Sequence, residues 1–375
     1  MRILIASDKY KGSLTATEVA EILSEALTKG LPDFEIDLCP IADGGEGTTE
    51  AMITALGGEW IESQTLDAHT RPIAARYGWM PQQSEAILEM SAASGLALIS
   101  DLPLDATQAS TQGTGLLMLD AIQRGAKKLV IGIGGSATND GGLGMAAALG
   151  YQFLDAQDQA IQPIMANLHL LERIVPPAVV FPEILVACDV DNPLLGPHGA
   201  TRIYGPQKGV TDFAFFEDRL KKLADIAARD LGCDPREIPG SGAAGGLGYG
   251  LMTFCGARLV SGFDLISQQI GLEERVAKAD LIITGEGRLD AQTLHGKGPI
   301  GVALMARRLG KAVVAFAGSI DDSPALRAHF DLAYAIKPSH MQLAQAILEA
   351  RPLLATAAER ALPEIKALLG LAPVQ

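Results

Sequence analysis

Short apolar segments alternate with Gly-rich polar loops and helical segments at both ends of the chain, and this order strongly constrains the fold. Near the start, a strand predicted at 2–6 leads into the loop DKYKGS and a helix predicted at 15–29, with Thr15 and Glu18 at capping-box spacing. The same order returns near the end, with strands predicted at 281–284, 312–317 and 332–336. Such alternation favours a parallel sheet, so we predict one α/β domain built from both ends of the chain.

The middle of the chain has a different pattern. Residues 59–90 contain short strand-like pieces and no long helix, and a mixture of strands and helices follows them. The chain has 375 residues, a length that favours two domains. We therefore predict a two-domain α/β fold, in which residues 1–60 and 278–375 form one domain. Residues 61–277 form the second α/β domain, which is inserted into the first.

Charge and composition exclude several classes of protein. The formal net charge is −14 and the sequence pI is about 4.9, which argues against a nucleic-acid binder because such proteins usually carry a basic face. No apolar run approaches the ~18 residues of a membrane span, and the start of the chain lacks the pattern of a signal peptide. The four cysteines form no CxxC pair, which disfavours a zinc site or a disulfide framework. We predict a cytoplasmic protein with no nucleic-acid or membrane partner.

The loop GIGGSATNDGG at 132–142 is the first candidate binding feature. It follows a predicted strand and leads into a predicted helix. Backbone N–H groups can approach an anion closely where glycine removes the Cβ, and a helix N-terminus favours negative charge. The loop is therefore a candidate phosphate cradle, with tight turn packing as the alternative. Its candidate phosphate-binding residues are Gly134, Gly135, Ser136, Asn139 and Asp140.

Two other glycine patterns resemble nucleotide-binding fingerprints but lack the surroundings that such sites need. The GxGxxA pattern that starts at Gly132 fits a dinucleotide site, but Gly141 and Gly142 would break the helix that should follow. The GxGxxG pattern that starts at Gly240 follows a proline and not a strand. The sequence contains no GxxxxGK[ST] motif, which excludes a Walker-type nucleotide site.

Paired carboxylates are the second candidate feature. Asp189 and Asp191 stand two residues apart at a predicted strand end, where an extended chain would place both on one side. Such a pair suits Mg²⁺, and one member could instead accept the proton of a substrate hydroxyl. An Asx-turn before Asn192 is the structural alternative. Two further acidic pairs are Asp43 with Glu46 and Glu286 with Asp290.

Cations in Gly-containing loops are the third candidate feature. They are Lys11, Lys208, Arg288 and Lys297. In an acidic chain these residues are candidates for neutralising phosphate or carboxylate groups, with solvated surface charge as the alternative. Phosphate cradles, carboxylates suited to Mg²⁺ and scattered cations together indicate phosphoryl transfer, because its transition state needs positioning and charge neutralisation.

At these same loops the sequence resembles the type I glycerate kinases. The matching segments run in order over most of the chain: DKYKGSLTA (8–16), PIADGGEGT (40–48), EMSAASGL (89–96), STQGTG (110–115), IGIGGSATNDGG (131–142), ACDVDNPLLGPHGA (187–200), YGPQKG (204–209), GAAGGLG (242–248), SGFD (261–264), DLIITGEGRLDAQT (280–293) and GKGP (296–299). The sequence departs from the family pattern at Lys9, where a small hydroxyl residue is expected, and at Cys255, where proline is expected.

The resemblance implies a fold and an activity. It implies ATP-dependent phosphorylation of D-glycerate at the 2-hydroxyl, which gives 2-phosphoglycerate and ADP. It also implies that the domain built from both chain ends is flavodoxin-like, and that the inserted domain is of a different α/β type. The active site is expected in the cleft between the domains, with ATP and Mg²⁺ as cofactors and D-glycerate as the small-molecule partner.

With this resemblance, the candidate residues receive expected roles. The expected base for the 2-hydroxyl is Asp189, and the second candidate is Asp290. The cations expected to neutralise the γ-phosphate or the glycerate carboxylate are Lys11 and Arg288. The expected Mg²⁺ ligands are Asp191 and Asp43. The remaining candidates for binding substrate or phosphate are Lys208, Glu286 and Lys297, together with the 134–142 loop.

Two other classes of function stay open at this point. One is a different small-molecule enzyme, such as a phosphatase or a kinase that acts on another hydroxy acid. The other is a ligand-binding regulator that has lost catalysis, although the full set of acidic pairs argues against that loss. A homodimer is the candidate assembly.

Overall fold

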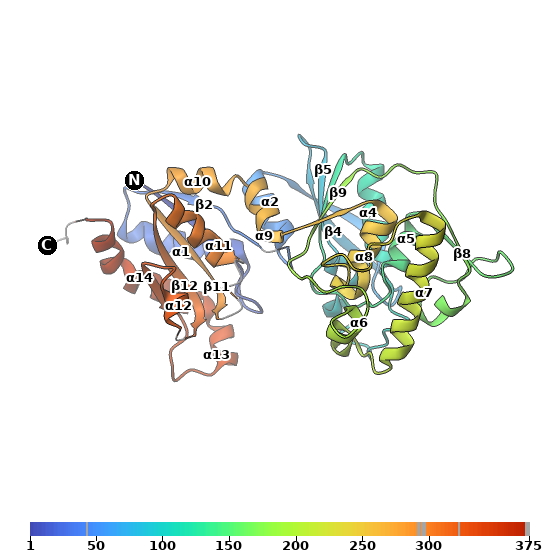
Figure 1. Ribbon diagram of the computed structural model, residues 1–375. Coiled ribbons are helices and arrows are strands. Elements are labelled where there is room, and N and C mark those ends of the chain that lie inside the picture. Colours follow the sequence, from blue (N-terminus) through green and yellow to red (C-terminus); the bar gives the residue numbers. More distant parts are fainter. Residues whose placement is uncertain (43, 291–292, 294–297, 322, 372–375) are drawn as a thin grey trace. The chain divides into compact units, whose positions relative to one another are not determined.

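The computed structural model describes residues 1–42, 44–290, 293, 298–321 and 323–371. Two predicted site residues, Asp43 and Lys297, lie outside the described residues. The chain divides into two compact units: unit 1 consists of Met1–Asp43, Glu50–Gly57 and Phe263–Gln375, and unit 2 consists of Gly44–Thr49 and Gly58–Gly262. Figure 1 shows both units, with the two chain ends in unit 1.

Unit 1 contains a five-stranded sheet in which all strands are parallel. The strand order is β13-β12-β11-β1-β2. The bounds are β1 (Arg2–Ser7), β2 (Glu35–Leu38), β11 (Leu281–Leu289), β12 (Ala312–Ile320) and β13 (Leu332–Ala335). Counted in chain order within the unit, the strands lie in the order 2-1-3-4-5, which is the flavodoxin-like doubly wound arrangement. The predicted fold class is thus confirmed.

Both faces of this sheet are covered. Ile3 and Ile5 belong to a core that includes buried residues of α1 (Ala16–Gly30) and α14 (Ala350–Leu368). Leu4 is equally buried but lies outside that core, because successive strand residues point to opposite faces. Helix α11 (Gly298–Arg308) packs against β1, β11 and β12. Strands buried on both faces explain the short, continuous apolar runs of the sequence.

Local sequence signals place the ends of several unit 1 elements. The predicted capping box is confirmed, since Thr15 Oγ1 accepts a hydrogen bond from the Glu18 amide and the Glu18 carboxylate accepts one from the Thr15 amide. The sequence also predicts a helix over 340–350, and this prediction is wrong in extent. The chain instead forms a turn that the Met341 amide closes by donating to the Pro338 carbonyl, followed by the short α13 (Leu343–Leu348).

Residues 263–277 belong to unit 1, whereas the predicted boundary placed them in the inserted domain. They contain most of α9 (Gly262–Gln269) and α10 (Leu272–Lys278). The ring of Phe263 lies directly on Gly301 of α11, where a Cβ would come within 2.4 Å of it. This packing against α11 attaches the segment to unit 1. The other unit 1 helices are α2 (Thr48–Leu56), whose first two residues belong to unit 2, and α12 (Pro324–Arg327).

Unit 2 contains a six-stranded mixed sheet with the strand order β10-β9-β6-β5-β4-β3. The bounds are β3 (Glu59–Leu66), β4 (Pro72–Met80), β5 (Glu85–Glu89), β6 (Lys128–Gly132), β9 (Glu183–Ala187) and β10 (Arg258–Val260). The last four of these strands are parallel, and β3 and β4 continue the sheet in antiparallel fashion. The sequence did not single out β3, because this edge strand carries polar residues such as Glu62 and Gln64 among few apolar ones.

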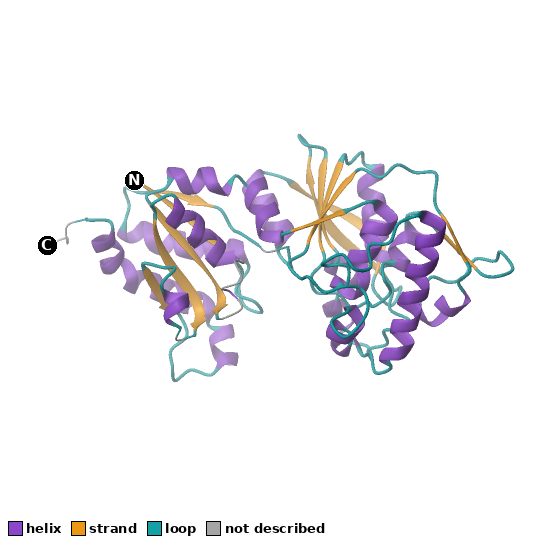
Figure 2. Ribbon diagram, viewed as in Figure 1, coloured by secondary structure: helices purple, strands orange, loops and turns teal. Residues whose placement is uncertain are grey.

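Helices pack around this sheet, as Figure 2 shows for the twisted fan of strands in unit 2. They are α3 (Ser91–Ser94), α4 (Gln112–Gln123), α5 (Leu143–Ala148), α6 (Ala200–Tyr204), α7 (Phe213–Leu231) and α8 (Ala243–Cys255), with the 3₁₀ turns η1 (Leu96–Ile99), η2 (Met165–Leu170) and η3 (Pro206–Lys208) and a separate hairpin of β7 (Gln152–Leu154) and β8 (Arg173–Val175). The sequence also predicts a helix over 213–231 that Gly232 ends, and α7 confirms it, since Gly232 takes the left-handed conformation there. Within the described residues, no helix is long and apolar enough to cross a membrane.

Candidate active site

Unit 1 has a topological switch point between β1 and β11, where the strand order reverses. In open α/β sheets, ligands bind beyond the carboxyl ends of the strands at such a point. The loop after β1 lies against the end of β11 there. The Asp8 amide donates to the Gly285 carbonyl at 2.8 Å, and a Cβ on Gly287 would lie 3.2 Å from the backbone nitrogen of Lys11. The structure therefore brings Lys11 and the end of β11, which carries Glu286 and Arg288, to one place in unit 1.

Several charges at this switch point already have partners. The Arg288 guanidinium lies 3.2 Å from Asp321 and 3.4 Å from Asp290, and 62% of its side chain is exposed. Glu286 accepts a hydrogen bond of 2.7 Å from the Thr293 hydroxyl. Lys11 is exposed. Unit 1 thus has two accessible cations at this place, Lys11 and Arg288, and the neighbouring carboxylates orient Arg288.

In unit 2, the carboxyl ends of β6, β9 and β10 meet the segment Gly44–Thr49. The contacts are close because they involve glycines. A Cβ on Gly44 would lie 2.4 Å from the Cβ of Ala187, and a Cβ on Gly134 would lie 3.1 Å from the Cα of Gly45. Side chains on Gly44 and Gly134 would therefore push the strand ends and the Gly-rich segment apart. This packing explains why both segments are rich in glycine.

Glu89, at the end of β5, holds the start of helix α2. Its carboxylate accepts hydrogen bonds from the Gly47 amide at 3.1 Å and the Thr49 amide at 2.8 Å. An acidic group at this position satisfies helix N–H groups that have no partner within the helix. Glu89 was not among the site residues predicted from the sequence. The signal that could have found it is its place at a strand end inside the segment EMSAASGL.

Asp189 and Asp191 follow β9, which ends at Ala187. Both residues lie beyond the strand, so the two-residue alternation that would place them on one side does not apply. Asp189 is partly buried and accepts a hydrogen bond of 3.0 Å from the Gly262 amide, while Asp191 is exposed. Among the described residues, no group of three or more His, Cys, Asp or Glu side chains is arranged to hold a metal ion. A pair of carboxylates still fits Mg²⁺, which usually keeps waters and substrate phosphates as its other ligands.

Asp140 is fully buried, and its carboxylate is used in hydrogen bonds within unit 2. Its carboxylate accepts hydrogen bonds from the amide and hydroxyl of Thr111, both at 2.8 Å, and from the amides of Gly142 and Gly144, both at 3.2 Å. Burial raises the pKa of Asp140, and these hydrogen bonds oppose the shift. The same carboxylate therefore joins the start of α4 to the start of α5.

Lys208 is also buried, with 1% of its surface exposed. Its ammonium nitrogen lies 2.6 Å from the Ser136 hydroxyl and 2.6 Å from the Thr138 carbonyl. Burial lowers the pKa of Lys208 to about 7, and the nearby charge of Asp140 opposes that shift. Asn139, which has no exposed surface, donates to the Thr201 hydroxyl at 3.0 Å. The structure thus brings three of the predicted loop residues, Ser136, Asn139 and Asp140, into the interior of unit 2 together with Lys208.

The turn that follows Asn139 depends on glycine in α8. Gly245 has a φ of +68°, and a Cβ on it would lie 2.0 Å from the Thr138 carbonyl oxygen. We expect Gly245→Ala to lower the free energy of unfolding by about 3 kcal/mol, since left-handed strain costs about 1–2 kcal/mol and overpacking about 1–3 kcal/mol. Urea unfolding followed by tryptophan fluorescence measures this, because Trp60 and Trp79 both lie in unit 2.

Gly232→Ala is the matched control for that variant. Gly232 has a φ of +69° but no atom within 4 Å of the Cβ position. It should therefore lose only the cost of the left-handed conformation, about 1 kcal/mol. Equal losses in the two variants would contradict the packing argument.

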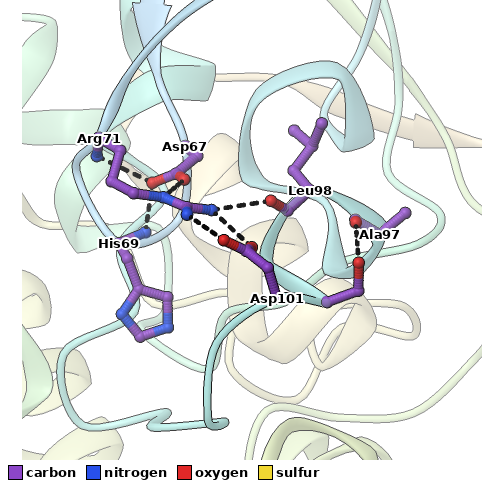
Figure 3. A network of polar contacts seen from close by, with 7 residues as sticks. Asp67, His69, Arg71, Ala97, Leu98 and Asp101 are labelled. Atoms are coloured by element: carbon purple, nitrogen blue, oxygen red, sulfur yellow. Dashed lines mark hydrogen bonds and ion pairs between the residues drawn. The ribbon is translucent and has the colours of Figure 1, made fainter.

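The corner between β3 and β4 lies beside the Ser136 loop. Figure 3 shows Arg71 at its centre: the guanidinium donates to Asp67, to the carboxylate of Asp101 and to the Leu98 carbonyl. The His69 ring points away from these carboxylates. Ala68, Ile99 and Ala137 form a small buried cluster, so this corner packs directly against the loop that carries Ser136.

Comparison with known proteins identifies the family. The model of the glycerate kinase family matches residues 3–366. The chain belongs to the glycerate kinase family. The resemblance inferred from the sequence motifs is confirmed, and with it the assignment to the kinases.

Individual glycerate kinases match most of the chain. The protein named glycerate 2-kinase from Escherichia coli K12 is 43% identical over 328 residues, which cover 86% of each chain. A glycerate kinase from Halalkalibacterium halodurans is 41% identical over 364 residues, which cover 95% of this chain and 96% of that protein. A crystal structure described as glycerate kinase 2 from Salmonella typhimurium LT2 superimposes with a TM-score of 0.89 at 39% identity, over 99% of this chain and 100% of that one.

The glycerate kinase motifs are divided between the two units. The segments around Lys11 and Arg288 belong to unit 1. The segments around Ser136, Asp189 and Lys208 belong to unit 2. Most of these residues lie at or beyond the carboxyl ends of parallel strands. Lys208 instead contacts the loop that follows such a strand, through Ser136.

Proposed function

We propose that this chain is an ATP-dependent kinase that transfers the γ-phosphoryl group of ATP to the 2-hydroxyl of D-glycerate. The products are 2-phosphoglycerate and ADP, and Mg²⁺ is the metal cofactor. The observation that carries the proposal is the 43% identity over 328 residues to the E. coli protein named glycerate 2-kinase. Gly-rich loops, carboxylates and cations at strand ends support it, because phosphoryl transfer depends on positioning and charge neutralisation.

In this proposal Asp189 accepts the proton of the glycerate 2-hydroxyl while that oxygen attacks the γ-phosphorus. Its hydrogen bond from the Gly262 amide supports the role, since it gives the carboxylate a fixed orientation. Asp290 is the second candidate for the base. Its 3.4 Å approach to Arg288 makes it the weaker one, because a cation already matches its charge.

Cations and loop amides neutralise and hold the phosphate groups. Lys11 and Arg288 act on the γ-phosphate or the glycerate carboxylate, and the exposure of both side chains supports this. The cradle for phosphate oxygens is Gly134, Gly135 and Ser136. The residues that hold this cradle in place are Asn139, Asp140 and Lys208. Glu286 and Lys297 are the remaining candidates for substrate contacts.

Mg²⁺, when bound, supplies further neutralisation of phosphate charge. Asp191 and Asp43 are its proposed ligands, because carboxylates that leave room for water and phosphate suit this ion. The homodimer and the cytoplasmic location stay predictions.

Phosphorus NMR of the product formed from D-glycerate, ATP and Mg²⁺ tests the proposal. We expect the signal of 2-phosphoglycerate to grow as that of ATP declines. A 3-phosphoglycerate signal would keep the kinase and contradict the orientation of the substrate, since a different hydroxyl would face the base. Unchanged ATP with folded protein would contradict the kinase activity and favour another acceptor or a ligand-binding regulator.

A further inference from the structure

We propose that Lys208 is a positioning residue that orients the Ser136 hydroxyl as a hydrogen-bond donor to an anionic oxygen of a substrate. The oxygen belongs to an ATP phosphate or to the glycerate carboxylate, which share the same acceptor chemistry. The inference rests on the proposed function and deepens it. Lys208 then acts on the substrate through Ser136 and does not touch it.

The chemistry of Lys208 decides whether the Ser136 hydroxyl donates or accepts in their hydrogen bond. The Lys208 nitrogen is 2.6 Å from the Ser136 oxygen. An ammonium group can only donate hydrogen bonds, so the Ser136 oxygen accepts and its own hydrogen is left to donate elsewhere. Phosphate and carboxylate oxygens only accept, and they are the groups that such a donor would meet.

Burial separates the roles of the two side chains. Lys208 has 1% of its surface exposed, whereas Ser136 keeps 8%. The second hydrogen bond of Lys208, to the Thr138 carbonyl at 2.6 Å, also holds it inside the protein. Ser136 lies in the Gly-rich loop after β6, where a bound anion is expected. Ser136 is thus the member of the pair that a ligand can reach.

The backbone on both sides of Ser136 is fixed as well. The Leu96 amide donates to the Gly135 carbonyl, and the Ala137 amide donates to the Ser94 carbonyl, both at 2.9 Å. Leu96 belongs to the segment that Arg71 holds in place, because the Arg71 guanidinium donates to the Leu98 carbonyl and the Asp101 carboxylate, as Figure 3 shows. The hydroxyl therefore has little freedom except rotation about its own bond, which Lys208 controls.

Proton loss from Lys208 would reverse this arrangement. A neutral amine has a lone pair that can accept the Ser136 hydrogen, so the hydroxyl would turn toward Lys208 and stop donating to the ligand. Burial lowers the pKa of Lys208 to about 7, while Asp140 is the charged group whose field acts against that shift. The contribution of Ser136 to binding should therefore be large below pH 7 and fade above it.

The test compares Ser136→Ala with the unmodified protein at pH values from 6 to 9. KM and kcat are measured for each protein, separately for ATP and for D-glycerate. For each substrate, the KM of Ser136→Ala is divided by the KM of the unmodified protein, and this ratio cancels the ionisation of the substrate itself. At pH 6 we expect a ratio of about 10 or more for one substrate, the effect of one hydrogen bond to a charged group, falling toward 1 at pH 9. The substrate that shows the effect identifies the anion.

Lys208→Met isolates the positioning role. In this background Ser136→Ala should change KM by less than about twofold at every pH, because the hydroxyl is no longer oriented. Lys128→Met is the matched control, since Lys128 pairs with Glu85 at 3.3 Å in the same sheet and should leave KM unchanged. Circular dichroism checks folding, and if Lys208→Met fails to fold, the pH profile of the KM ratio decides alone.

Two results would overturn the inference while the kinase activity stands. One is a KM ratio near 1 at all pH values for both substrates, which would mean that Ser136 donates to neither. The other is a raised ratio that stays the same in the Lys208→Met background, which would mean that Ser136 donates without Lys208. Absence of ATP consumption by the unmodified protein would instead overturn the proposed function.

Discussion

Asp189→Asn is expected to lower kcat by about 10²–10⁴-fold, the usual contribution of a general base, with little change in Tm. The asparagine keeps an oxygen that accepts the hydrogen bond from the Gly262 amide, so the local structure is retained. It lacks the basicity needed to take the proton of the substrate hydroxyl. Steady-state kinetics with D-glycerate and ATP, together with a thermal unfolding curve, measure both quantities.

Asp155→Asn is the control for this variant. Asp155 also accepts hydrogen bonds from backbone amides, those of Gln157 and Gln159, but it lies in the turn after β7, in the separate hairpin and outside the six-stranded sheet. Its kcat should stay within about twofold of the unmodified enzyme. Near-normal turnover by Asp189→Asn would show that another group is the base, and Asp290→Asn would then be the next variant.

Asp140→Ala is expected to have the largest effect on stability. It leaves the amide and hydroxyl of Thr111 and the amides of Gly142 and Gly144 without their buried acceptor. Each such donor costs about 1–3 kcal/mol, so the free energy of unfolding should fall by about 4 kcal/mol or more. Urea unfolding followed by the fluorescence of the two tryptophans, both in unit 2, measures the loss.

Asp140→Asn serves as the graded comparison for that variant. It keeps one accepting oxygen and should lose less stability than Asp140→Ala. A loss below about 1 kcal/mol for the alanine variant would refute the structural role of this carboxylate. Asp140 would then be free to act as a direct ligand of phosphate, as the sequence alone suggested.

The sequence predicted most of the fold because its local signals agree with the final structure. The predicted helix over 15–29 and its capping box correspond to α1, and Gly232 marks the end of α7. Errors arose where tertiary contacts decide. Strand β3 has weak alternation because it lies at the edge of its sheet, and the residues after Gly262 join unit 1 through the packing of Phe263 on Gly301.

The candidate site was predicted as a set of loops but not as a set of roles. Parallel strands bring their carboxyl ends to one edge, so polar loops after such strands can be grouped from the sequence. Burial cannot be read in this way. Lys208 and Ser136 are 72 residues apart, and nothing local distinguishes a lysine enclosed in unit 2 from an exposed one such as Lys11. Glu89 was missed for the same reason, since its partners Gly47 and Thr49 lie far away in the sequence, in the loop before α2 and in its first turn.

The pairing of β1 with β11 has a consequence for synthesis on the ribosome. Ile3 pairs with Leu281, so the first strand must remain without this neighbour until almost three quarters of the chain has been made. Unit 2 lies between them in the sequence and can collapse around its own core while translation continues. The nascent chain thus carries an exposed apolar strand for many seconds, at a translation rate of about 5–20 residues per second. This interval is when chaperones would be needed most, because unpaired strand edges invite aggregation.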